Sequence, residues 1–213
     1  MTSYDIEKAH DYSPLAVHFT KERKFARPNL IAHDHPLHAV KSSTAKERLL
    51  SILRSKTIYA SPMPWIPRNA KAVCFTECVW DSLRHLTERY SSFGIVVNKR
   101  LLFKGGGGPA LYVRGDVMKK LGSAVPGELE PYIAPFDPDG VIKAGMSLDY
   151  LREREWRLPS DLCFEYADLE HVLVGSVEDA MDVVREIGAV NLPQKKVIPM
   201  DVYNSIKDSW GPW

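Results

Sequence analysis

Short apolar runs recur along this chain, and they constrain its fold more than any other feature. Each is four to seven residues long, the length of a β-strand, and is bounded by polar or turn-forming residues. They lie at residues 14–20, 57–61, 72–77, 93–97, 110–113, 155–159, 171–176 and 195–200. Helical patterns separate some of these runs but not others, so the strict alternation of a doubly wound sheet is missing. We therefore expect an α+β fold.

The helical segments have clear start and stop signals. In residues 42–56, Thr44 and Glu47 have the spacing of a capping box, and a leucine-rich stripe follows. Residues 177–188 form a second amphipathic pattern that ends at a glycine. Shorter helices are expected at residues 79–90, 116–121 and 201–210. Residues 122–145 contain four prolines and give no clear pattern.

The composition indicates one domain over residues 1–213, in a cytoplasmic protein whose cysteines are reduced. The net charge of +1 gives no overall field that attracts nucleic acid or an anionic membrane. Three cysteines are an odd number and too few for a disulfide framework. The first 13 residues lack the apolar core of a signal peptide, and no apolar stretch reaches the roughly 18 residues of a membrane span.

Residues 149–162 (DYLREREWRLPSDL) gather charge around a tryptophan. If this segment is a strand, Trp156 and Leu158 share the inward face. Glu153, Glu155 and Arg157 then share the other face, about 6–7 Å apart in succession. Such a group fits the wall of a cleft for a charged or hydroxyl-rich ligand, whereas the alternative is a surface ion-pair cluster worth about 0–1 kcal/mol per pair.

The order of segments resembles that of the AbiGi family of abortive-infection, phage-resistance proteins. The order is HFT, LLSIL, IYAS, AVCFTE, FGIVV, GGPALYV, EREWRLP and HVLVGS. The resemblance covers about residues 17–176, and residues 177–213 are then a C-terminal extension with a strand and a helix. It implies a role in phage defence, and it also implies a non-enzymatic alternative, because the family is described as an antitoxin component.

The spacing also resembles, more distantly, DarT-type ADP-ribosyltransferases. This resemblance implies two small, splayed antiparallel sheets flanked by helices, with NAD between them. It matches His18, Phe19 and Thr20 to the strand that holds NAD, and Glu155 to the catalytic glutamate. Tyr112 falls on a matching central strand. The chain departs from that pattern in its insert at residues 122–145 and in lacking a clear arginine-rich NAD loop.

The implied chemistry breaks the nicotinamide–ribose bond through a cationic, oxocarbenium-like transition state. A carboxylate near the ribose stabilises that charge, which is the role expected of Glu155, with Glu153 as the candidate general base. Tyr59 or Tyr112 is a candidate to stack on nicotinamide. Arg157 is a candidate for a bidentate pair with the pyrophosphate. His18 either binds the ribose or is a core histidine whose ring is satisfied by backbone.

Three functions remain open at this point. The first is an NAD-using transferase that modifies a nucleic-acid or protein acceptor, and the second is a non-enzymatic antitoxin or regulatory partner of a toxin. The basic segment Lys21–Pro28, which includes an aromatic residue, suits a nucleic-acid partner. The third is a zinc-binding module, for which His33, His35 and His38 are candidate ligands together with two cysteines, Cys74 and Cys78; we assign no metal to the chain.

Overall fold

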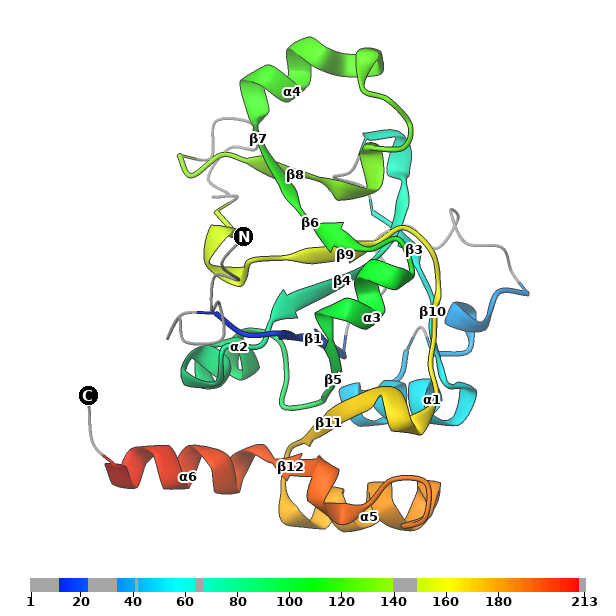
Figure 1. Cartoon of the computed structure of the whole chain (residues 1–213), viewed down its shortest axis with the longest axis vertical. Helices are drawn as coiled ribbons and strands as arrows, with labels where there is room; N and C mark the ends of the chain where they lie inside the picture. Colours follow the sequence, from blue (N-terminus) through cyan, green and yellow to red (C-terminus); the bar gives the residue numbers. More distant parts are fainter. Residues whose placement is uncertain (1–11, 23–33, 41, 64–66, 140–148, 211–213) are drawn as a thin grey trace, which may run out of the picture.

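The computed structural model describes residues 12–22, 34–40, 42–63, 67–139 and 149–210. Its centre is an eight-stranded mixed sheet in the order β12-β11-β5-β1-β4-β9-β6, with β3 attached to β4 (Figure 1). The strands are β1 (Leu15–Phe19), β3 (Ser61–Pro62), β4 (Lys71–Glu77), β5 (Gly94–Asn98), β6 (Gly108–Pro109), β9 (Trp156–Leu158), β11 (Leu169–Val174) and β12 (Val197–Pro199). The expected α+β class is therefore confirmed.

Helices pack on both faces of this sheet. They are α1 (Ala45–Ser55), α2 (Leu83–Arg89), α3 (Lys99–Lys104), α5 (Val177–Ile187) and α6 (Met200–Trp210), whereas α4 (Gly115–Leu121) packs on a smaller, two-stranded sheet. On one face, Leu49 and Leu53 of α1 and Val183 of α5 join the main hydrophobic core. On the other face, Leu83 of α2 and Met200 of α6 belong to a second, smaller core. The sheet thus separates two surfaces, each with its own set of helices.

The sheet opens at the end of its central strand. The β1–β5 ladder continues to the pair Phe19↔Gly94, whereas the β1–β4 ladder consists of only Ala16↔Glu77 and Val17↔Thr76. Gly94 contributes to this difference, because a Cβ there would lie 2.8 Å from the carbonyl oxygen of His18. The bare backbone at Gly94 lets the last residues of β1 stay close to β5 while β4 diverges.

Two further sheets have only two strands each. The first joins β2 (Thr57–Ile58) to β10 (Leu162–Cys163) in antiparallel fashion. The second joins β7 (Leu111–Arg114) to β8 (Ile133–Phe136) in parallel, and lies with α4 at the top of Figure 1. The expectation of two small splayed antiparallel sheets is therefore wrong as stated, because the main strands form one continuous sheet and the β11–β12 pair is parallel.

Most predicted elements lie where the periodicity placed them, and the exceptions have local causes. The expected strand 57–61 is divided between β2 and β3, because its two ends pair with different strands. The expected strand through Glu153–Arg157 begins only at Trp156, because Glu153 ends a 3₁₀ turn and Arg154 has a left-handed backbone (φ 45°). The sequence pattern also missed α3 and β8.

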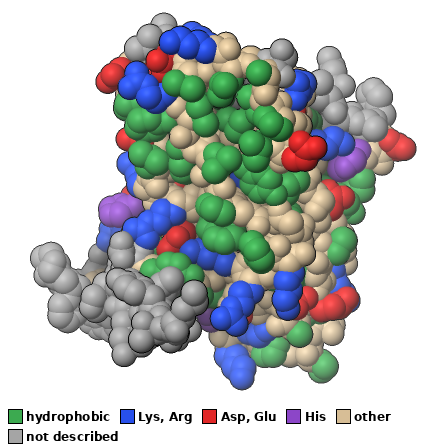
Figure 2. All heavy atoms as spheres, turned by 45° about the horizontal axis from the view of Figure 1, so that its top comes forward, with side chains coloured by type: hydrophobic (Ala, Val, Ile, Leu, Met, Phe, Trp, Pro, Cys, Tyr) green, Lys and Arg blue, Asp and Glu red, His purple; other side chains and the backbone are tan. Residues whose placement is uncertain are grey.

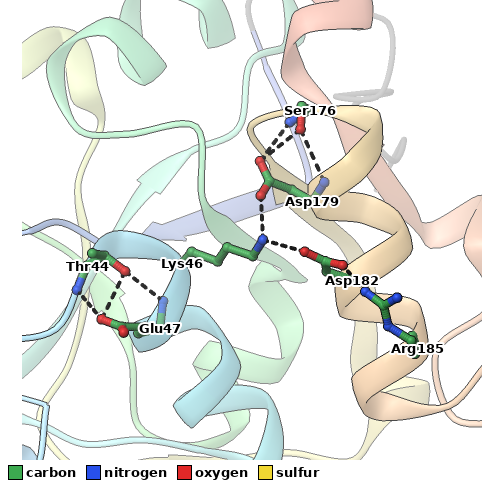
Figure 3. Close-up of polar contacts among 7 residues, drawn as sticks. All are labelled: Thr44, Lys46, Glu47, Ser176, Asp179, Asp182 and Arg185. Atoms are coloured by element: carbon green, nitrogen blue, oxygen red, sulfur yellow. Dashed lines mark hydrogen bonds and ion pairs between the residues drawn. The ribbon is translucent and has the colours of Figure 1, made fainter.

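Polar contacts fix how α1 and α5 begin and how they pack together (Figure 3). Thr44 and Glu47 form the predicted capping box, and Ser176 and Asp179 form a second one. Lys46 of α1 reaches across to Asp179 (2.8 Å) and Asp182 (2.7 Å) of α5. The start of α1 is thereby joined to the N-terminal half of α5, a helix far away in sequence, by partly exposed ion pairs.

We expect Thr44→Ala and Ser176→Ala each to lower the free energy of unfolding by about 1 kcal/mol, because each leaves a backbone amide of the first helical turn without its acceptor. Urea unfolding followed by circular dichroism measures this. Ser82→Ala is the matched control, since Ser82 occupies the N-cap of α2 without a side-chain cap bond. Equal losses in all three variants would contradict the assignment of the two capping boxes.

Candidate active site

A pocket of about 130 Å³ lies beside the end of β1, between α1 and the β2–β3 segment. His18, Thr20 and Tyr59 line it, as does Phe19, so four of the six predicted NAD-binding residues border one cavity. Lys21 and Arg48 add positive charge to the same lining, and serines and threonine add hydroxyls: Ser51, Ser55, Thr57 and Ser61. We refer to this cavity as the β1 pocket.

His18 occupies the place where β1 and β4 separate. Its Nδ1 lies 2.8 Å from the carbonyl oxygen of Cys74 on β4. Because a carbonyl only accepts hydrogen bonds, Nδ1 carries the proton and donates, and Nε2 of the neutral ring is then an acceptor. The ring also lies 5.6 Å from that of Phe75. The His18 ring therefore binds the backbone, as expected of a core histidine, and it also borders a polar cavity.

Thr20 and Tyr59 differ in how they are held. Thr20 is buried, and its hydroxyl donates to the carbonyl of Ala45 at the start of α1 (2.7 Å). Its contact is thus structural, since it joins the end of β1 to α1. Tyr59 packs edge-on against the ring of His35, with the ring centroids 5.3 Å apart. Tyr59 therefore brings an aromatic ring to the pocket, and such a ring can stack on a ligand.

A second polar group surrounds Glu153, and we refer to it as the Glu153 cluster. The Tyr90 hydroxyl donates to Glu153, and Nε of Arg89 lies 3.2 Å from the same carboxylate. The Arg89 guanidinium lies 4.8 Å from the centroid of the Tyr150 ring. The Tyr90 ring stacks on Phe19 with 5.4 Å between centroids and 6° between planes. Phe19 therefore contacts both the β1 pocket and this cluster.

Burial controls the protonation of the Glu153 cluster. Glu153 is 4% exposed, and loss of solvation raises the pKa of its carboxyl, against the opposing effects of Tyr90 and Arg89. Burial also raises the pKa of Tyr90 well above its ordinary value, so its hydroxyl stays protonated and donates. A protein carboxyl with a raised pKa beside a fixed donor is a candidate proton acceptor.

Glu155 and Arg157 form a nearly closed pair beside the Glu153 cluster, close enough that, besides burial, the charge of Glu155 raises the pKa of Glu153. Nε and Nη2 of Arg157 each lie 3.0 Å from one carboxylate oxygen of Glu155. Arg157 is 2% exposed, and its Nη1 donates to the carbonyl of Ile133 on β8 (2.6 Å). Arg157 therefore binds a carboxylate of its own chain, and this pair joins β9 to the β7–β8 sheet.

Tyr112 belongs to the Glu155 side of the molecule and not to the β1 pocket. Its hydroxyl donates to the carbonyl of Tyr150 (3.0 Å) and accepts from the backbone N–H of Glu155 (3.3 Å). Burial raises the pKa of Tyr112 to about 12. The ring thus fixes the chain around Glu155, and of the two tyrosines proposed for stacking only Tyr59 borders the cavity.

The structure does not bring His18 and Glu155 together. Strand alternation directs His18 to the face of the sheet that carries Phe75. Glu155 pairs with Arg157, whose partner on β4 is Cys74, so both lie on the opposite face. The expected shared pocket is therefore wrong. Glu153 contacts the end of β1 through Tyr90 and Phe19, and because Phe19 alternates with His18 along the strand, Glu153 also lies on the face opposite His18.

Sequence reasoning missed Arg48, Arg89 and Tyr90. Tyr90 falls at the end of the helix expected over residues 79–90, whereas it follows α2 as the C-cap residue and its hydroxyl donates to Glu153. Arg48 lies in α1, away from the buried leucines that defined that helix. The sequence signal for Arg48 was the presence of a cationic residue in the helix that follows the strand with His18, Phe19 and Thr20.

A metal centre finds no support in the part of the chain that the structure describes, where no three His, Cys, Asp or Glu side chains form a metal-binding group. His33 and the side chain of His38 lie outside the described residues. Burial raises the pKa of the Cys78 thiol to about 12, which disfavours the thiolate that zinc requires. None of the described helices has the length and apolarity to cross a bilayer.

Comparison with known proteins returned no family model, no curated protein and no solved structure that matches this chain. The family resemblance stated from the sequence therefore stays a prediction, and the site is interpreted from its own geometry.

We expect the stability contributed by Glu153 to fall as pH rises above about 4.5, the ordinary pKa of a glutamate, toward its raised pKa, whereas burial lowers the pKa of His171 and gives an opposite contribution below about 6.5. In that window the folded protein binds the carboxyl proton more tightly than the unfolded chain, so each increase in pH favours unfolding. Glu153→Gln should remove the downward contribution of Glu153 to the slope in urea unfolding at pH 4.5–7, and Glu128→Gln, at an exposed position, is the control. Identical slopes in wild type and Glu153→Gln would contradict the pKa direction.

We expect Glu155→Ala to destabilise the fold by about 3–5 kcal/mol, because it leaves the buried Arg157 guanidinium without its carboxylate. Denaturant unfolding measures the loss. Glu186→Ala removes an exposed ion pair with Arg54 and should cost less than about 1 kcal/mol. A similarly small loss for Glu155→Ala would mean that the pair does not stabilise the contact between β9 and β8.

Proposed function

We propose that this protein is an ADP-ribosyltransferase-like enzyme that uses NAD as a substrate at the opening between β1 and β4. The observation that carries the proposal is the end of the β1–β4 ladder at Val17, directly beside a cavity with two cations, several hydroxyls and an aromatic ring. A dinucleotide presents a diphosphate, ribose hydroxyls and flat rings, and this lining offers a partner for each.

The β1 pocket supplies the binding groups in this proposal. Arg48 and Lys21 balance the diphosphate charge from the positions where backbone carbonyls hold them, Arg48 Nε at that of Ser43 (3.2 Å) and Lys21 Nζ at that of Arg89 (3.1 Å). The acceptor Nε2 of His18 suits a ribose hydroxyl, and the Tyr59 ring suits a stacked base. The cavity of about 130 Å³ is small beside the roughly 300–1,000 Å³ of most ligand sites. In this proposal one end of NAD therefore lies in the β1 pocket, and the rest of the NAD molecule lies across the open rim of the pocket, over Phe19.

The Glu153 cluster supplies the chemistry. Transfer breaks the bond between ribose C1′ and the nicotinamide nitrogen, and the electron pair leaves with nicotinamide. An acceptor oxygen or nitrogen then bonds to C1′ and gives up its proton. Glu153, with its raised pKa, accepts that proton in this proposal, and its charge together with the Tyr90 hydroxyl favours the cationic ribose. This assignment moves the main role from Glu155, which Arg157 already neutralises, to Glu153.

The biological setting in this proposal is bacterial phage defence, with a nucleic-acid or protein acceptor. It is supported by the order of segments that resembles the AbiGi family, and the acceptor class is supported only by the local run of basic residues at positions 21–28.

We expect NAD to bind to the purified full-length protein and Arg48→Ala to weaken binding by roughly tenfold, the effect of one lost charge-assisted contact. Isothermal titration calorimetry measures both. Arg54→Ala is the matched control, since Arg54 lies on the same helix, more than half exposed, and pairs with Glu186. Release of nicotinamide should fall about 100-fold in Glu153→Gln. Failure of NAD to bind the wild type removes the proposal.

A second function is favoured by one specific observation. Both carboxylates face an arginine of their own chain, Glu153 with Arg89 and Glu155 with Arg157, as in a site whose charges are already satisfied. A non-enzymatic antitoxin or regulatory partner would fit this. Stoichiometric binding of a toxin encoded beside the gene, unchanged by Glu153→Gln and without any release of nicotinamide, would favour this function over the enzyme.

A further inference from the structure

The part of the molecule formed by β7, β8 and α4 carries a cluster of exposed apolar side chains. Val117 (40% exposed) and Leu121 (44%) lie on α4, Leu111 (44%) lies on β7, and Leu129 (44%) precedes β8. Figure 2, in which the top of Figure 1 is turned forward, shows hydrophobic side chains gathered on this face. We refer to these four residues as the α4 patch.

This patch lies on a small two-stranded part of the fold, outside the main sheet. β7 and β8 form a parallel sheet of only two strands, an arrangement that is marginal in water without further cover. Contiguous apolar surface on a folded protein usually marks a contact with another molecule. Among the described residues, α4 covers part of this small sheet and leaves its own outer stripe exposed.

The charged residues beside the apolar stripe of α4 are arranged so that they can pair with those of a second copy of this chain. Val117 and Leu121 are four residues apart and share one face of α4. Asp116 and Lys120 are also four residues apart, and each comes one residue before an apolar one, so both lie on the same flank of the stripe. When two identical helices pack antiparallel about a two-fold axis, the same flank of each faces the other, with reversed direction. Asp116 of one copy then lies opposite Lys120 of the other, twice in the contact.

We propose that the α4 patch is the two-fold interface through which this chain forms a homodimer. The apolar stripe supplies the buried centre of that interface, and the two Asp116–Lys120 pairs fix the antiparallel direction. Arg114 pairs with Asp116 within the chain (3.1 Å) and lowers the pKa of that carboxyl, so Asp116 is charged at neutral pH. Among the described residues Lys120 has no ion-pair partner of its own, which a second copy would supply.

Sedimentation equilibrium of the full-length protein tests the apolar centre. We expect a concentration-dependent dimer in the wild type and a monomer for Leu121→Asp. Met181→Asp is the matched control, because Met181 is 56% exposed on α5, away from this face, and should leave the dimer intact. A wild type that stays monomeric over the whole concentration range, or a dimer unaffected by Leu121→Asp, overturns the proposal. Circular dichroism checks that each variant is folded.

Charge exchange tests the direction of packing. Asp116→Lys or Lys120→Asp alone places like charges opposite each other twice, and each should raise the dimer dissociation constant by roughly tenfold. The double variant Asp116→Lys with Lys120→Asp restores opposite charges and should return the constant close to that of the wild type. A double variant as weak as the single ones overturns the antiparallel arrangement, and so does a dimer that the single changes leave untouched.

Discussion

The separation of β1 from β4 at His18 is the constraint on which the rest of the site depends. Gly94 allows β1 to remain against β5, and the His18 ring takes the place of the lost ladder bond by donating to the Cys74 carbonyl. The backbone acceptor that the divergence would leave unpaired is thereby satisfied. The same divergence creates the cavity beside α1 and turns Phe19 toward Tyr90, so one irregularity in the sheet determines both polar groups.

The two carboxylates that the sequence places side by side have different physical roles. Glu155 is neutralised by a buried guanidinium that also binds the backbone of β8, so it stabilises the contact between the main sheet and the small β7–β8 sheet. Glu153 is buried beside the Tyr90 hydroxyl and the Arg89 guanidinium. It has lost its solvation, and these contacts do not form the bidentate pair that Glu155 has. Burial therefore raises the pKa of Glu153, and the proposed catalytic role falls to Glu153 for this reason.

Periodicity and capping signals predicted most of the fold, because they depend on neighbours within one turn or one strand. Thr44 with Glu47 and the glycine after residue 187 are of this kind. The site was less predictable because it depends on contacts between distant segments and on one backbone angle. The left-handed Arg154 removes Glu153 from the strand, which no alternation rule anticipates, and Tyr90 reaches Glu153 across 63 positions of sequence.

The state of the His18 ring is the most direct test of the central claim that the sheet opens there to hold a ligand. A long-range proton–nitrogen NMR spectrum of the histidines reports the tautomer and its response to NAD. The account predicts a ring protonated on Nδ1, with an Nε2 resonance that shifts on addition of NAD while that of His171, on β11, stays in place. A ring protonated on Nε2, or a His18 signal that NAD leaves unchanged, would contradict it.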